Sequence, residues 1–282
     1  MTMPLTPELE PKDVNETDLY PIVNASLRQR YDRIAACWNT DAYEGTRRDD
    51  LIEELVRVGQ VEDHQTILEA MCGTGILARS IRQRFPRVQM YVLDFSRGML
   101  NMIPEGMVKV QASVIAMPFP DQVFHRVFLR SGIYDLPKRL QLKALYEMKR
   151  ILTEKGMLIL QTYYTTPTTK EALNNIVNIK DLASGQYEDM GREYPRYFAL
   201  REELEAWLEE AGFAVETIRT FEGAIRYLKT KEMMELGKDL WVEYMNDLPQ
   251  QTKEEIKLRS EPDGSLTYNF PGIIYRLTPS SL

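Results

Sequence analysis

The sequence predicts an α/β fold, a doubly wound and mainly parallel sheet with helices on both of its faces. Between residues 66 and 164, short apolar segments alternate with segments whose apolar positions recur at helical spacing. A glycine turn, Gly73-x-Gly75, directly follows the first apolar segment and lets the chain reverse sharply into a helix. The chain of 282 residues, 44% of them hydrophobic, is large enough to bury the core of one such domain.

The elements follow in a regular order. Apolar and aromatic positions in "LRQRYDRIAACWN" and "RRDDLIEELVRVG" predict two helices before the first strand. Short runs rich in β-branched and aromatic residues predict strands, at 66–70, 89–94, 107–113, 123–130 and 156–164. Amphipathic runs predict the helices that alternate with them, at 76–85, 96–103 and 138–152.

Strands become rarer after residue 165. Helices are predicted at 169–187 and 200–212, with Gly212 as a C-terminal cap, and a charged helical segment at 230–259. Further strands are predicted, at 213–223 and 265–278. We therefore expect one domain in three parts: N-terminal helices and lid (1–59), the core of the sheet (60–165), and helical lid insertions with the last two strands (166–282).

The lid insertions occupy residues 166–200 and 229–266. Apolar residues of the second insertion recur at helical spacing and predict a face that packs on the domain or on a second copy of the chain, so a homodimer is compatible with the sequence. These residues are Met233, Leu236, Leu240, Tyr244 and Leu248.

Composition narrows the class of partner. A formal net charge of −7 and an isoelectric point near 5.2 argue against a general nucleic-acid binder, which needs clustered Lys and Arg. Two cysteines, Cys37 and Cys72, and two histidines, His64 and His125, predict neither a disulfide framework nor a metal site. The N-terminus has no signal-peptide pattern, and no apolar run is long enough to span a membrane. We expect a cytoplasmic protein that binds a small molecule, with neither a nucleic acid nor a membrane as partner.

The expected ligand site lies at the carboxyl ends of the first two strands. Ligands of doubly wound sheets bind there, and Gly73 and Gly75 let the backbone approach a ligand closely. Asp94 ends the second strand, where a carboxylate can accept both hydrogen bonds from a ribose diol. The turn also fits the dinucleotide fingerprint of dehydrogenases, so these residues predict a nucleotide cofactor without deciding which one.

Four segments together carry a more specific resemblance. They are "ILEAMCGTG", "VLDFSRGML", "VQASVIAMPFPDQVFHRVF" and "MKRILTEKGMLIL", in this order, across about residues 60 to 165. In these segments the chain resembles the class I S-adenosylmethionine-dependent methyltransferases, especially their ubiquinone/menaquinone-biosynthesis-like, small-molecule branch. The resemblance implies a seven-stranded Rossmann-like sheet with a reversed last strand, and "FAVETIRT" and "GIIYRLT" look like its final pair.

The resemblance also implies S-adenosylmethionine as cofactor, with S-adenosylhomocysteine as product. It places the ribose on Asp94 and the adenine between Phe95 and Val114. It places the amino-acid end of the cofactor near Glu69, Cys72, Gly73 and Gly75, with Met99 nearby. Ser113 and Arg130 are further cofactor-binding candidates, and Tyr31 and Trp38 from the N-terminal helix are expected to close over the cofactor. The chain departs from the family at Met71, where the first motif glycine is usual, and at Ser113, where an acidic residue is usual.

Residues after the fourth and fifth strands are expected around the methyl acceptor. Methyl transfer from a sulfonium is an in-line displacement, so holding donor and acceptor together supplies most of the rate. Tyr134, Tyr163 and Arg130 are the catalytic candidates, with Ser131 and Tyr164 beside them: aromatic rings stabilise a cation, and Arg130 could pair with an acidic group. Neither histidine lies at a strand end, so no general base is evident, and the predicted acceptor is a nitrogen or oxygen of a small molecule.

Two other functions stay open at this point. The glycine turn is compatible with an NAD(P)-dependent oxidoreductase. Met71 and Ser113, the two departures from the family pattern, are compatible with a methyltransferase-like binding subunit that has lost catalysis.

Overall fold

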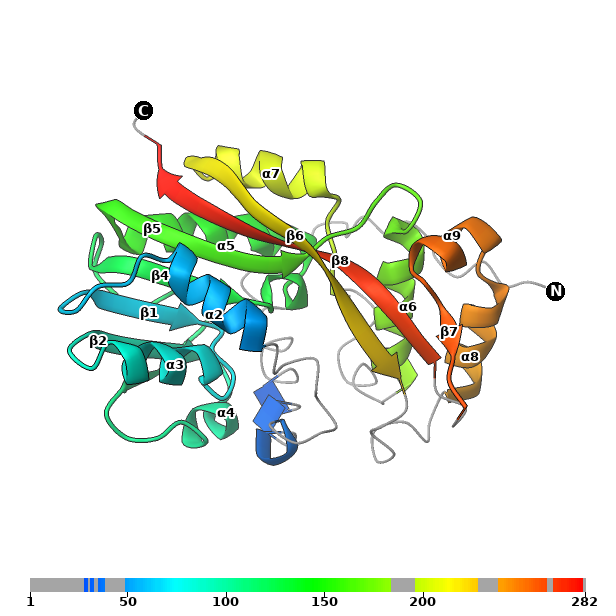
Figure 1. The fold of residues 1–282 in the computed structure, drawn as a ribbon, viewed down its shortest axis with the longest axis horizontal. Helices are drawn as coiled ribbons and strands as arrows, with labels where there is room; N and C mark the ends of the chain where they lie inside the picture. The colour runs from blue at the N-terminus through cyan, green and yellow to red at the C-terminus, as the bar shows by residue number, and fades with distance from the viewer. Residues whose placement is uncertain are drawn as a thin grey trace, which may run out of the picture.

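A computed structural model of the chain describes residues 28, 29, 31, 32, 35–38, 49–183, 196–227, 238–262 and 266–280. Their centre is an eight-stranded sheet in the order β3-β2-β1-β4-β5-β8-β6, with β7 paired to β8 (Figure 1). The strands are β1 (Thr66–Ala70), β2 (Gln89–Asp94), β3 (Val108–Gln111), β4 (Phe124–Arg130), β5 (Leu152–Tyr163), β6 (Phe213–Tyr227), β7 (Arg259–Ser260) and β8 (Leu266–Pro279). The helices are η1 (Ala35–Cys37), α2 (Asp49–Val58), α3 (Ile76–Arg84), α4 (Arg97–Asn101), η3 (Ile133–Asp135), α5 (Lys138–Ile151), α6 (Lys170–Ala183), α7 (Arg201–Glu210), α8 (Lys238–Asp247) and α9 (Gln250–Glu255).

The order of the strands fixes where a ligand can bind. Strands β1 to β5 are parallel, whereas β8 runs antiparallel to both β5 and β6. The chain moves outward from β1 to β3 and then returns to β4 on the other side of β1, which makes the gap between β1 and β4 the topological switch point. The expected Rossmann-like sheet with a reversed last strand is confirmed, and the two C-terminal segments form the expected final pair. The two-residue strand β7 is an eighth strand beyond the seven expected.

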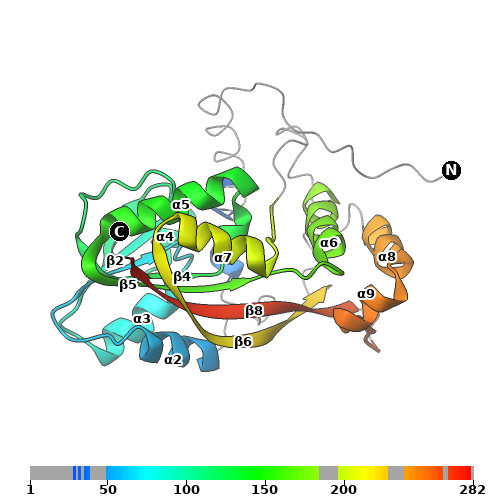
Figure 2. The same cartoon turned by 90° about the horizontal axis from the view of Figure 1, so that it is seen from above.

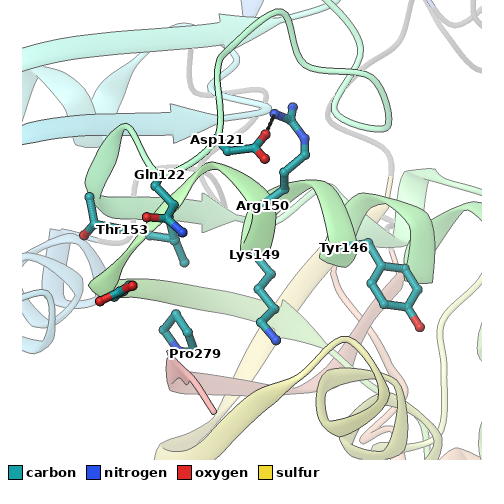
Figure 3. A pocket seen from close by; sticks show the side chains of 9 residues that line it. Asp121, Gln122, Tyr146, Lys149, Arg150, Thr153 and Pro279 are labelled. Atoms are coloured by element: carbon teal, nitrogen blue, oxygen red, sulfur yellow. Dashed lines mark hydrogen bonds and ion pairs between the residues drawn. The ribbon is translucent and has the colours of Figure 1, made fainter. Parts of the chain in front are cut away.

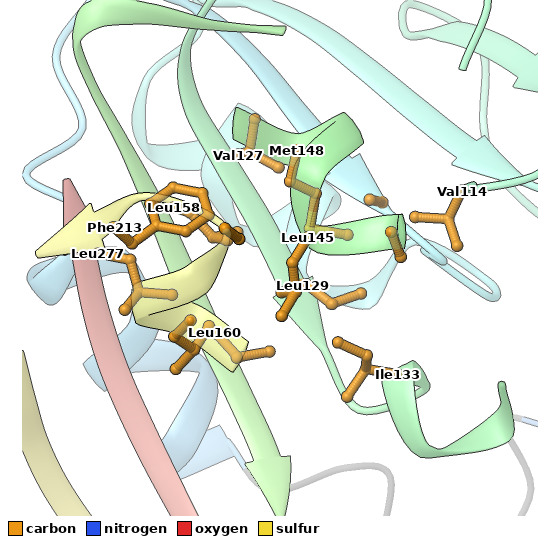
Figure 4. Close-up of a cluster of buried hydrophobic side chains, with 14 of the residues drawn as sticks. Val114, Val127, Leu129, Ile133, Leu145, Met148, Leu158, Leu160, Phe213 and Leu277 are labelled. Carbon is orange, nitrogen blue, oxygen red and sulfur yellow. The ribbon is translucent and has the colours of Figure 1, made fainter. Parts of the chain in front are cut away.

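Helices cover both faces of the sheet (Figure 2). Side chains alternate between faces along a strand, so Val127 and Leu129 of β4 enter the core under α5 and α7, while Phe128 enters the core under α2 and α3. Figure 4 shows the first of these cores, in which Leu145 and Met148 of α5 pack on the strands. On the other face, a Cβ atom at Gly59 would overlap the Phe128 ring, which explains a glycine just after α2.

A third apolar cluster lies beyond the common sheet. Strands β6 and β8 extend past β5, and α6, α8 and α9 lie beside their extended ends (Figure 1). Tyr268 and Phe270 of β8 pack there with Ile176 of α6 and Met245 of α8. The helices expected in the two insertions are therefore present in the described residues, and their action as a lid stays a prediction, as do the three boundaries within the domain.

The second insertion differs from the predicted continuous helix at 230–259. The structure has two helices there, α8 and α9, which are separated at Leu248 and Pro249 and followed by β7. Pro249 has no backbone N–H and a fixed φ, so it ends one helix and starts the next, as N-cap of α9. Met233, Leu236 and the side chain of Leu240 lie outside the described residues, whereas Tyr244 and Leu248 pack in the third cluster.

Smaller differences concern the ends of elements. Strand β5 begins at Leu152, before Gly156, and β6 continues to Tyr227 instead of ending at residue 223. Residues 28, 29, 31 and 32 are helical and lead to η1, and α2 confirms the second N-terminal helix. None of the helices in the described part of the chain has both the length and the apolar character needed to cross a bilayer.

Phe128 should be a main determinant of stability. Its side chain is fully buried, and Phe128→Ala should lower the free energy of unfolding by about 3–5 kcal/mol because it leaves a cavity under α2. Tyr146→Ala is the matched control, since this ring is 45% exposed and its loss should change stability by about 0.5 kcal/mol or less. Urea unfolding of both variants measures the difference, and equal losses would contradict the packing described here.

Candidate functional site

Asp94 joins the carboxyl ends of β1 and β2. Its Oδ2 atom accepts a hydrogen bond from the backbone N–H of Gly73 at 2.8 Å, and Oδ1 accepts one from the N–H of Ser96 at 2.9 Å. Gly73 and Gly75 have φ values of +54° and +70°, in the left-handed region where glycine is favoured. Burial raises the pKa of Asp94 to about 6, so the carboxylate is mainly ionised at neutral pH. Its two oxygens have lone pairs beyond those used by the two N–H groups.

Two buried side chains, Glu69 and Cys72, pack against the glycine turn from the side of the core. The Oε2 atom of Glu69 accepts a hydrogen bond from the N–H of Ala78 at 2.8 Å, which anchors the start of α3 to β1. Burial raises the pKa of Glu69 to about 7, although the positive charge of Arg130 opposes this rise. Burial also raises the pKa of the Cys72 thiol, so this cysteine stays protonated and acts as a small apolar side chain.

The N-terminal segment packs on this end of the sheet. The Tyr31 ring makes edge contacts with Trp38 and Phe95, with centroids 5.7 and 5.6 Å apart. Asp32 fixes the segment, because its Oδ1 atom accepts hydrogen bonds from Ser96 Oγ at 2.6 Å and from the N–H of Gly98 at 2.7 Å. The three rings therefore lie beside the Gly73 turn, and the closing of Tyr31 and Trp38 over a cofactor stays a prediction.

Two residues that are not glycine adopt a left-handed backbone at the carboxyl ends of β1 and β4. They are Met71, with φ of +51°, and Ser131, with φ of +54°. Such residues are uncommon there and concentrate at functional sites. A Cβ atom at Gly132 would lie 3.3 Å from Met71 Cε, so the two loops are in contact. Met71 thus retains the conformation that a glycine would adopt with less strain.

Aromatic side chains gather at the carboxyl end of β5. This aromatic cluster consists of Tyr134, Tyr163, Phe198, Phe221 and Phe270. Tyr134 stacks on Phe198 with centroids 4.4 Å apart, and Tyr163 lies 5.9 Å from Tyr134. Burial raises the pKa of Tyr134, so its phenol is neutral at physiological pH and is a poor general base.

Glycines on two neighbouring strands make room for the rings of the aromatic cluster. A Cβ atom at Gly223 of β6 would overlap the Tyr163 ring, and one at Gly272 of β8 would overlap the Phe221 ring. The rings therefore lie directly on the backbone of the sheet.

A hydrogen bond and an ion pair meet at Asp135 and connect the two halves of the site, the Gly73 turn with its rings and the aromatic cluster. Tyr31 OH donates to Asp135 Oδ2 at 2.5 Å, and Arg196 Nε lies 3.0 Å from Asp135 Oδ1. Arg196 also donates to the Tyr31 hydroxyl at 3.4 Å. Asp135 thereby holds the N-terminal segment and the strand-like segment before α7 against η3.

The predicted residues divide between these two halves. The turn at the ends of β1 and β2 brings together Tyr31, Trp38, Glu69, Cys72, Gly73, Gly75, Asp94, Phe95 and Met99. Tyr134 and Tyr163 lie in the aromatic cluster, and Arg130 lies between the halves, near Glu69. Ser113 and Val114 follow β3, with Val114 buried in the core under α5, so an adenine site between Phe95 and Val114 stays a prediction.

The sequence interpretation missed three side chains that the structure places at the site, Asp32, Phe198 and Phe270. Asp32 is a neighbour of the predicted Tyr31, which was the only available signal. Phe198 and Phe270 are distant in the sequence from the tyrosines that they contact, and no local pattern marks them.

A surface hollow of about 380 Å³ lies elsewhere (Figure 3). It is lined by the first residues of β5, the last turn of α5 and Pro279, which places it at the amino end of β5 and away from the carboxyl ends of the strands. Arg150 there is engaged by Asp121 at 2.8 Å and by Glu147 at 2.7 Å. We therefore do not assign the site to this hollow. The described residues also contain no cluster of His, Cys, Asp and Glu side chains suited to a metal ion.

The pKa of Glu69 predicts a pH-dependent stability. A carboxyl whose pKa is about 7 in the folded chain and near 4.5 in the unfolded chain stabilises the fold at low pH, and this contribution is lost as the pH rises through 7. Between pH 5 and pH 8 the loss should be about 2 kcal/mol. Glu69→Gln keeps an oxygen for the N–H of Ala78 and should remove this part of the slope in urea unfolding. Glu154 is exposed, so Glu154→Gln should leave the pH dependence of stability unchanged. An unchanged pH dependence in Glu69→Gln would show that Glu69 is not the group responsible.

Comparisons with known proteins indicate the class of protein to which the chain is similar. A family model described as a methyltransferase domain matches residues 67–156. A demethylmenaquinone methyltransferase of Chlamydia muridarum is 34% identical over 101 residues, which are 34% of this chain but only 42% of that enzyme. A demethylmenaquinone methyltransferase of Staphylococcus aureus is 26% identical over 216 residues, covering 71% of this chain and 87% of that enzyme.

Among solved structures, the YcgJ protein of Bacillus subtilis superposes with a TM-score of 0.72 at 16% identity, covering 83% of this chain and 100% of that one, which supports the fold. The nicotinamide oxidoreductase and the non-catalytic subunit that the sequence left open are not favoured by these relatives. Together with the switch-point turn and the carboxylate at the end of β2, these relatives support the class I S-adenosylmethionine-dependent methyltransferases as the family that this chain resembles.

Proposed function

We propose that this chain transfers a methyl group from S-adenosylmethionine to a nitrogen or oxygen atom of a planar, aromatic small molecule. The observation that carries the proposal is the buried Asp94 carboxylate, which is bonded to the Gly73 turn at the topological switch point. Methyltransferase relatives support the reaction class, and the acceptor class is our inference from the aromatic cluster.

The residues present fit this cofactor. Asp94 is ionised above about pH 6 and has lone pairs for the hydroxyls of a ribose, while Phe95, Tyr31 and Trp38 offer ring surfaces to an adenine. A larger residue is disfavoured at Gly75, because its φ is +70° and a Cβ atom there would lie 3.0 Å from Ile103 Cδ1. When bound, the cofactor supplies an electrophilic methyl group on a sulfonium.

The protein's part in the reaction is to hold the methyl donor and the acceptor, to orient them toward each other and to exclude water from them. Asp94 and the glycine turn would fix the donor, and the aromatic cluster would receive the acceptor against a surface without water. Tyr134 stays neutral and Glu69 is bonded to the start of α3, so neither is a ready base. We infer an acceptor that needs no strong base, such as an amine or an oxygen that is already ionised.

The proposed acceptor class follows from the aromatic cluster, which is the second half of the site. Stacked rings such as Tyr134 and Phe198 favour a planar partner, because offset stacking adds to the burial of apolar area. The chlamydial and staphylococcal relatives are named for demethylmenaquinone, which supports a small-molecule acceptor for this chain as well.

Asp94→Ala should abolish cofactor binding. Calorimetric titration with S-adenosylhomocysteine should show an affinity at least about 100-fold lower than in the wild type, because the variant loses charge-assisted hydrogen bonds to the ligand and the bond to Gly73. Asp121 lies near the amino end of β5, so Asp121→Ala should bind S-adenosylhomocysteine with the wild-type affinity. NADH should not bind to any of the three proteins. Undiminished binding by Asp94→Ala would refute the site.

Cofactor affinity should also depend on pH. Burial raises the pKa of Asp94 to about 6, and only the ionised carboxylate accepts hydrogen bonds from both hydroxyls of a diol. Affinity for S-adenosylhomocysteine should therefore be full above pH 7 and fall roughly tenfold by pH 5. Glu69→Gln should retain this fall and Asp94→Asn should lose it. A flat profile in the wild type would show that Asp94 does not contact the ligand.

A further inference from the structure

Two glutamines are buried next to the aromatic cluster, and their amides differ in one respect. Gln141 and Gln161 are each 1% exposed. The amide nitrogen of Gln141 donates to the backbone oxygens of Leu136 at 3.0 Å and Tyr197 at 2.7 Å. The amide nitrogen of Gln161 is buried and has no hydrogen-bond partner among the residues that the structure describes. Buried polar groups are normally satisfied, so this unmet donor requires an explanation.

The rest of the Gln161 amide is held in place. Ser131 donates twice to Gln161, from its N–H to the backbone oxygen at 2.8 Å and from its hydroxyl to Oε1 at 3.2 Å. Ser131 makes these bonds from a left-handed backbone, with φ of +54°. Strain of this kind persists where the surrounding structure enforces it, often at binding sites. The amide oxygen is therefore occupied, and the NH₂ group is the part left for a ligand.

Gln161 belongs to the acceptor half of the site. It lies at the carboxyl end of β5, two residues before Tyr163 and therefore on the same face of the strand. Its partner Ser131 lies just before η3, the turn that carries Tyr134, and Tyr134 stacks on Phe198. The unmet donor thus lies close in the fold to the rings of the aromatic cluster.

We propose that Gln161 is an acceptor-binding residue whose NH₂ group donates a hydrogen bond to an oxygen atom of a planar aromatic acceptor. The inference rests on the proposed function. Small-molecule sites are mostly apolar, with a few polar groups that set the orientation of the ligand. A site built to bond an oxygen rejects an analogue that lacks it, because the buried donor is then left unpaired. Gln161 would in this way select oxygen-bearing acceptors.

The first test compares two variants without any ligand. Gln141→Met removes an amide with two satisfied hydrogen bonds and should lower the melting temperature by at least about 4 °C. Gln161→Met removes one hydrogen bond, from Ser131, together with an unmet donor of the same burial, so it should lower the melting temperature clearly less than Gln141→Met does. Equal destabilisation by both substitutions would show that the NH₂ group of Gln161 has a structural partner, which would overturn the proposal.

The second test uses two probes of the same shape, 1-tetralone and tetralin, which differ by one carbonyl oxygen. In the presence of S-adenosylhomocysteine, the wild type should bind the ketone at least about tenfold more tightly than the hydrocarbon by calorimetry. Gln161→Met should bind the two probes alike. A wild type without preference for the ketone, or a variant that retains the preference, would overturn the proposal.

Titration with S-adenosylhomocysteine alone separates the two possible sources of the oxygen. If the amide binds the acceptor, Gln161→Met should keep the cofactor affinity of the wild type within about twofold. A large loss would assign the amide to the carboxylate of the cofactor and overturn the acceptor role. Failure of the wild type to bind S-adenosylhomocysteine would refute the proposed function instead, and the melting temperatures would still report on the unmet donor.

Discussion

The hydrogen bond from Gly73 to the Asp94 carboxylate is the interaction on which the site depends. It joins the ends of β1 and β2, and it is possible because Gly73 takes a left-handed backbone. Burying the carboxylate is unfavourable, as its raised pKa shows, and the N–H groups of Gly73 and Ser96 offset part of that penalty. Ser96 in turn bonds Asp32, so the N-terminal segment is fixed to the same point. A ligand that bonds the remaining lone pairs would lower the penalty further, which is the physical basis for a ribose site.

A second carboxylate, Asp135, links this cofactor half to the acceptor half. Tyr31 and Arg196 come from segments distant in the sequence, and both bind Asp135, which is the residue that follows Tyr134. The parallel strands supply a rigid edge, whereas the long strands β6 and β8 carry the glycines and rings of the aromatic cluster. In the proposed function, the common sheet serves the cofactor, and the extension of the last two strands shapes the surface for the acceptor.

Sequence patterns predicted the sheet well because each strand and helix carries its own periodicity and the glycine turn has few alternative structures. Prediction from periodicity fails at Pro249. The charged segment has helical periodicity throughout, and the proline divides it into α8 and α9. The position of Asp94 could be predicted, since it ends a strand at the edge of the sheet where doubly wound folds bind ligands. Phe198, Phe270 and the unmet amide of Gln161 could not, because their roles arise from contacts between distant segments. Arg130 lies near Glu69, and its predicted catalytic and cofactor-binding roles stay predictions.

The central claim is that Asp94 holds the ribose of the cofactor. The most direct measurement compares the affinities of S-adenosylhomocysteine and its 2′,3′-dideoxy analogue for the wild-type protein by calorimetry. If the carboxylate accepts both hydroxyls, the analogue should bind at least about 30-fold more weakly, since two charge-assisted hydrogen bonds are lost. Equal affinities for the two compounds would contradict the account and remove Asp94 from the ligand site.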